Sequence, residues 1–69
     1  MTPKQKEMFD RLLKRKESYV ELKKTIMQDL RVARKLSFNL ECEKLIIDKK
    51  WVDEILENIE EDVIEMQSF

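Results

Sequence analysis

The segment RKLSFNL, residues 34–40, is the strongest interruption between two long runs of helix-forming residues. Ser37 and Asn39 both prefer helix caps and turns to helix interiors. The chain has no Gly, and its single Pro lies near the N-terminus, so no other segment carries the usual turn residues. The sequence therefore predicts a turn over about residues 37–39.

Upstream of this turn, the sequence predicts one helix over about residues 3–36. Thr2, Pro3 and Gln5 form a helix start, with Thr as the N-cap, Pro at the first helical position and Gln completing a capping box. Apolar residues then recur at steps of three and four, which gathers them on one side of the helix. A second capping sequence at Ser18 leaves open a break there, which would divide this helix and give the chain three helices instead of two.

Downstream of the turn, a second helix is predicted over about residues 40–67. Four of its apolar residues follow one another at steps of seven: Leu45, Val52, Ile59 and Met66. This spacing is typical of a coiled-coil-like seam. Because the connection is short, the two helices are expected to lie antiparallel. The predicted fold is all-α, an antiparallel helical hairpin that forms a single domain over residues 1–69.

A chain of 69 residues buries a small core, so additional stabilisation is expected from another source. Cys42 is the only cysteine and the chain has no His, which excludes an internal disulfide and makes a structural zinc site improbable. Cys42 is expected to pack as a small apolar residue. The remaining sources are a second copy, which would give a dimeric helical bundle, and another protein.

Charge is distributed unevenly between the two predicted helices. Residues 1–36 contain eleven Lys or Arg against five Asp or Glu, whereas residues 37–69 contain three against ten. The first half therefore carries a net charge of plus six and the second half minus seven. An antiparallel hairpin would place the basic helix beside the acidic one, so that the charges support the fold by complementarity.

Two lysines interrupt the apolar side of the first helix. Lys16 and Lys23 lie seven residues apart, which are equivalent positions in a coiled-coil repeat, where polar residues often fix the register. With the turn near Phe38, antiparallel pairing places Lys16 beside Glu60 and Lys23 beside Asp53. In the alternative, both lysines point into water from a rotated or broken helix.

The residue types argue against catalysis. Absence of His removes the commonest general base and the commonest metal ligand, and no serine has a recognisable base or a Gly-bearing turn around it. The sequence therefore predicts no enzyme activity, no metal site and no cofactor.

The second helix carries the best candidates for a protein interface. Apolar residues outside the seam, together with carboxylates on one flank, form this predicted set: Ile46, Ile47, Trp51, Asp53, Glu57, Glu61 and Ile64. Trp is enriched among residues that dominate binding energy, and carboxylates four apart repel one another unless a partner offsets them. Two alternatives remain open: the apolar residues cover a small core, and the acidic flank is only a solvated face.

The first helix carries the candidates for contact with nucleic acid, namely Arg11, Lys14 and Arg15. A net charge of −1 for the chain and the acidic second helix oppose binding to phosphates. The leading hypothesis is therefore a small, non-enzymatic regulator or adaptor that binds a protein, such as a phage-type inhibitor or antirepressor. The alternative is a dimeric nucleic-acid-binding hairpin.

The surroundings in which the chain acts also follow from composition. The longest uninterrupted apolar run has three residues, Leu45 to Ile47, far fewer than the roughly 18 of a membrane-spanning helix. No membrane association is predicted. A single thiol and the lack of a signal segment favour a reducing compartment, so the expected location is intracellular, in the cytoplasm.

Overall fold

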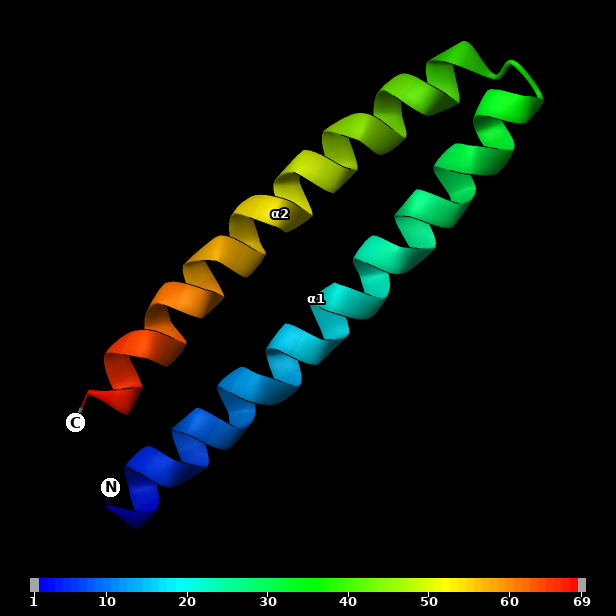
Figure 1. Cartoon of the computed structure of the whole chain (residues 1–69). Helices are drawn as coiled ribbons and strands as arrows, with labels where there is room; N and C mark the ends of the chain where they lie inside the picture. Colours follow the sequence, from blue (N-terminus) through cyan, green and yellow to red (C-terminus); the bar gives the residue numbers. More distant parts are fainter. Residues whose placement is uncertain (1, 69) are drawn as a thin grey trace.

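The computed structural model describes residues 2–68, and two helices account for nearly all of them (Figure 1). Helix α1 spans Pro3–Lys35 and helix α2 spans Asn39–Gln67, and the two pack against each other along their length. The hairpin measures 52 × 14 × 11 Å. Among the described residues there is no strand, so the predicted all-α fold with two packed helices is confirmed.

Helix α1 begins as its first residues predict. The Gln5 amide donates to Thr2 Oγ1 at 3.2 Å, and the Thr2 amide donates to Gln5 Oε1 at 2.9 Å, which completes the capping box. The alternative break at Ser18 does not occur, because α1 is continuous. The Ser18 hydroxyl instead donates to the Lys14 carbonyl one turn earlier, at 3.2 Å.

The turn is made by Leu36, Ser37 and Phe38. The Phe38 amide donates to the Ala33 carbonyl at 2.9 Å and the Ser37 amide to the Arg34 carbonyl at 3.2 Å. This pair of bonds is a Schellman motif, in which the residue after the C-cap is left-handed. Ser37 takes that conformation, with φ of 57°.

The start of α2 differs by one residue from the predicted one. Because the chain has already reversed at Ser37, Asn39 is free to enter the helix as its first residue. Phe38 then occupies the N-cap position and makes no side-chain capping bond. Its carbonyl accepts the first helical bond, from the Cys42 amide at 2.9 Å.

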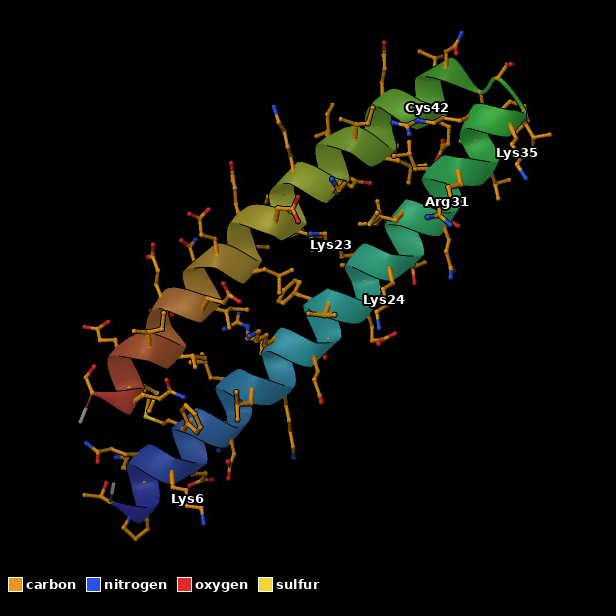
Figure 2. All side chains as sticks on the ribbon, in the orientation of Figure 1. Lys6, Lys23, Lys24, Arg31, Lys35 and Cys42 are labelled. Atoms are coloured by element: carbon orange, nitrogen blue, oxygen red, sulfur yellow. The ribbon has the colours of Figure 1, made fainter. Side chains whose placement is uncertain are left out.

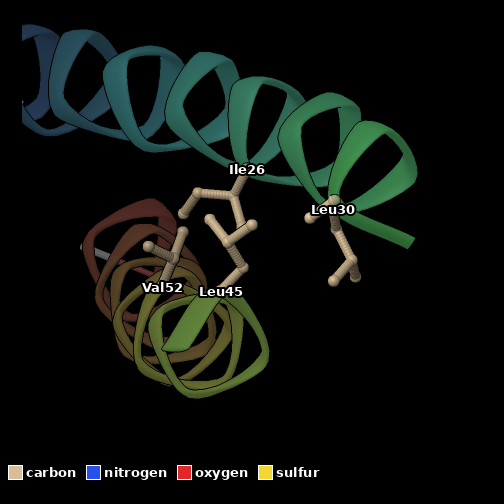
Figure 3. Close-up of a cluster of buried hydrophobic side chains, with 5 residues drawn as sticks. Ile26, Leu30, Leu45 and Val52 are labelled. Atoms are coloured by element: carbon tan, nitrogen blue, oxygen red, sulfur yellow. The ribbon is translucent and has the colours of Figure 1, made fainter. Parts of the chain in front are cut away.

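The best-packed part of the hairpin lies in the half nearer the turn. Ile26, Leu30, Leu45 and Val52 meet between the helices (Figure 3), together with Ala33. Val52 is only 1% exposed. Cys42 is half-buried against this cluster, which agrees with its expected packing role.

Burial is weaker toward the open end of the hairpin, where α1 begins and α2 ends. There α2 still buries Ile59 and Val63, but the described part of α1 before Ile26 contains no buried residue. The two helices are therefore held most firmly beside the turn and least firmly at the open end.

Candidate interaction surfaces

The two seam lysines make the ion pairs predicted from the turn position. Lys16 Nζ lies 3.4 Å from Glu60 Oε1, and Lys23 Nζ lies 2.7 Å from Asp53 Oδ1. Each lysine side chain is 36% exposed, and that of Lys23 extends between the helices (Figure 2). The lysine stems therefore cover part of the seam while the ammonium groups meet carboxylates at its edge, which confirms the predicted register.

Asp53 has a second cationic neighbour that the sequence-based prediction missed. Lys49 Nζ lies 3.9 Å from Asp53 Oδ2. The hydrogen bond from Lys23 lowers the pKa of Asp53 below its usual value; partial burial opposes this, and the charges of Lys23 and Lys49 reinforce it. The sequence could have predicted this neighbour, because Lys49 follows Cys42 by seven residues and precedes Leu56 by seven. Lys49 therefore also belongs to the seam.

An exposed apolar surface runs along the outer side of α2, and we call it the Trp51 flank. It consists of Leu40, Ile47 and Trp51, which are 83%, 67% and 59% exposed. Leu40 and Ile47 are seven residues apart, and Ile47 and Trp51 four apart, so all three lie on the same side of the helix. Trp51 is therefore outside the core.

The other predicted interface residues lie elsewhere on α2. Because successive residues turn by about 100° around a helix, Asp53 points about 160° away from Trp51. Ile46, Glu57 and Ile64 share the Asp53 side of α2 at helical steps, and Glu61 lies between the two flanks. The structure thus divides the predicted set into two surfaces, and Asp53 is already engaged by Lys23.

Comparison with known proteins does not add a relative. The chain matches no protein-family model, no curated protein and no solved structure. Function is therefore argued from the surfaces themselves.

The basic residues of α1 do not form an unbroken patch. Arg11 is held by Glu7, with 3.1 Å between Nη2 and Oε1. Lys14 and Arg15 are exposed. Asp10 and Glu17 lie one helical turn from Lys14 on either side, whereas Arg15 has no carboxylate one turn away. Two of the three predicted nucleic-acid contacts, Arg11 and Lys14, thus have carboxylate neighbours.

Residues 2–68 contain neither a cluster of metal ligands nor a helix able to span a membrane. No group of three or more Cys, Asp or Glu side chains is arranged to hold a metal ion. Neither α1 nor α2 combines the length and apolar character needed to cross a bilayer.

The turn also exposes apolar residues that the predicted interface did not include. Leu36 and Phe38 are each more than half exposed, next to Leu40. Phe38 and Leu40 line an open depression together with Asn39 and Glu41. In RKLSFNL the apolar residues Leu36, Phe38 and Leu40 alternate with polar ones. This alternation could have predicted that the turn exposes apolar side chains.

Proposed function

We propose that this chain is a small, non-enzymatic regulator or adaptor that binds another protein through the Trp51 flank. The observation that carries the proposal is the exposure of Leu40, Ile47 and Trp51 on one side of a continuous helix. Soluble monomers rarely expose large contiguous apolar surfaces without a use for them. A partner that covers the flank would remove these side chains from water.

Trp51 suits the role of an anchor for a protein partner. A Trp side chain offers a large apolar area, and Trp is prominent among the few residues that dominate protein interfaces. A rigid helix that presents an aromatic anchor and apolar neighbours fits an apolar groove on a partner. Occupying such a groove would act as inhibition, which is the mode expected of a phage-type inhibitor or antirepressor in the cytoplasm.

Self-association belongs to the same proposal. The seam follows seven-residue steps, and we infer a coiled-coil type of packing for it. A two-helix hairpin leaves the outer sides of both helices uncovered, and pairing with a second copy would cover one of them. A dimer would also supply the stabilisation that a chain of 69 residues needs.

The nucleic-acid alternative has weaker support. Phosphate binding requires basic side chains that are free to neutralise a backbone, whereas Arg11 is paired with Glu7 and Lys24 with Glu21. The alternative therefore enters the test below as a competing outcome.

The test is a pull-down from lysate with the immobilised chain, with and without nuclease. A protein that stays bound after nuclease treatment supports the proposal, and a protein lost on treatment favours the nucleic-acid alternative. The captured protein is then titrated against Trp51→Ala, which should weaken binding by more than about 1 kcal/mol. Ile64→Ala is the matched control, because Ile64 is 64% exposed on the other flank of the same helix. Equal effects of the two variants would contradict an interface at Trp51.

A further inference from the structure

One side of α1, continued by its C-cap residue, carries five residues at steps of seven, and we call it the α1 stripe: Met8, Arg15, Leu22, Asp29 and Leu36. All five are exposed. Near the open end the stripe borders Asp62 of α2, and near the turn it borders Glu41, because Met8 and Asp29 line surface depressions with these residues. The stripe therefore runs the length of one face of the hairpin.

The α1 stripe shows the same order of residue types from either end, except that the cation and the anion change places. Leu22 is at the centre. Seven residues away on either side are a cation, Arg15, and an anion, Asp29; fourteen away are two apolar residues, Met8 and Leu36. Neither Arg15 nor Asp29 takes part in an ion pair within residues 2–68.

We propose that the α1 stripe binds the α1 stripe of a second copy, antiparallel, with a two-fold axis through Leu22. This refines the self-association proposed above and rests on it. Two-fold symmetry requires that if one residue contacts another, the reverse contact also forms. Leu22 then meets its own copy, Arg15 meets Asp29 of the other chain twice, and Met8 meets Leu36 twice.

The exposed area of the hairpin is large enough to need such a partner. The chain of 8.4 kDa exposes 5823 Å², whereas a compact monomer of this mass exposes about 4,600 Å². The excess is roughly 1,200 Å². A standard interface buries about 800 Å² on each partner, so one dimer contact removes most of the excess.

A second row on the opposite side of α1 is a weaker candidate. It consists of Lys6, Leu13, Val20, Met27 and Arg34. An antiparallel pairing about Val20 would match apolar residues in the middle but place Lys6 opposite Arg34 at both ends. Like charges in direct contact are destabilising, so the α1 stripe is the better self-complementary surface.

The same two-fold axis determines which residues of α2 would meet α2 of the second copy. Since Lys16 pairs with Glu60 and Lys23 with Asp53, the level of Leu22 on α2 is close to Ile55, which would meet its own copy. Seven residues from Ile55 are Asp48 and Asp62, and these would face each other as like charges. This opposing contribution predicts that Asp48→Asn tightens the dimer by roughly threefold. Unchanged affinity would contradict this face-to-face arrangement.

Cysteine cross-linking tests the axis directly. In a Cys42→Ala background, Leu22→Cys places two thiols on the axis, within disulfide range. Leu36→Cys is the matched control on the same stripe, because its copy would be about 42 Å away. Under mild oxidation we expect about tenfold more cross-linked dimer for Leu22→Cys than for Leu36→Cys. Equal cross-linking would indicate parallel pairing, and none would place the interface elsewhere; either result overturns the proposal.

Charge exchange tests the register in the uncross-linked chain by sedimentation equilibrium. Arg15→Asp and Asp29→Arg should each weaken the dimer by roughly tenfold, and the double variant should restore it. Lys14→Asp makes the same change of charge one position off the stripe and should have little effect. A wild-type chain that stays monomeric would refute dimerisation itself. Because no other protein is present, none of these outcomes depends on partner binding at Trp51.

Discussion

At the scale of single residues, Ser37 is where the hairpin stores backbone strain. Its φ of 57° lies in the left-handed region, which costs a residue with a Cβ atom about 1–2 kcal/mol and costs Gly almost nothing. The position after a helix C-cap is usually Gly for this reason, but the chain contains none. The rest of the Schellman motif holds Ser37 in place.

Ser37→Gly should therefore raise the free energy of unfolding by about 1 kcal/mol, after allowance for the greater freedom of Gly in the unfolded chain. Urea denaturation followed by circular dichroism measures the change. Ser18→Gly, in the interior of α1, is the matched control and should lower stability by about 0.5–1 kcal/mol. A loss of stability for both variants would contradict the left-handed turn.

The Lys23–Asp53 pair predicts a dependence of stability on pH. The pKa of Asp53 is lower in the folded chain than its usual 3.8. The pair therefore contributes fully above that usual value, and its contribution is lost as the pH falls through the lowered pKa of the folded state. Because both side chains are more than a third exposed, the expected coupling is only about 0.2–1 kcal/mol.

A double-mutant cycle with Lys23→Met and Asp53→Asn measures this coupling at pH 7 and again near pH 2. We expect it to be larger at the higher pH than at the lower one. Glu54→Gln removes the neighbouring carboxylate, which makes no ion pair within residues 2–68, and should show no coupling with Lys23. Coupling that is as strong in acid as at pH 7 would argue against the ion pair as its origin.

At the scale of the helices, charge suits the helix dipoles beside the turn and opposes them at the open end. Arg34 and Lys35 occupy the last turn of α1, and Glu41 the first turn of α2, as the dipoles favour. The first turn of α1 has no acidic residue, and the last turn of α2 has no basic one. The charge distribution that makes a basic α1 attract an acidic α2 thus leaves the open ends of both helices without charges that suit the helix dipoles.

A basic residue at the end of α2 should recover part of this loss. Gln67→Lys is expected to raise stability by about 0.3–1 kcal/mol at low salt, and the gain should shrink as salt is added. Thermal unfolding at two salt concentrations is the measurement. Gln28→Lys, far from either end of α1, adds the same charge without the dipole and should give a smaller gain.

The elements that the sequence predicted well were those with local causes. The capping box at Thr2, the seven-residue steps of α2 and the position of the turn are all written in neighbouring residues, and the turn position placed Lys16 and Lys23 opposite their partners. The helix start at Asn39 was missed by one residue because the reversal depends on Ser37 adopting a left-handed conformation. The division of the candidate interface followed from helical rotation: Trp51 and Asp53 are too close in sequence to share a side.

At the scale of the whole molecule, the two charged halves should cancel toward distant phosphates. We expect no binding of mixed duplex or single-stranded oligonucleotides tighter than about micromolar at physiological salt. Fluorescence anisotropy is sufficient to measure it. Salt-sensitive binding that disappears when Arg11, Lys14 and Arg15 are neutralised would favour the nucleic-acid alternative.

Helix α1 begins and helix α2 ends at the open end of the hairpin (Figure 1), and this has a mechanical consequence. A force applied between residues 2 and 68 peels α1 from α2 one layer at a time instead of shearing the whole seam at once. The weakly buried open end separates first, the Lys16–Glu60 pair breaks before the Lys23–Asp53 pair, and the cluster around Val52 separates late. In an optical trap the hairpin should therefore unzip at low force, with its highest resistance shortly before the turn is reached.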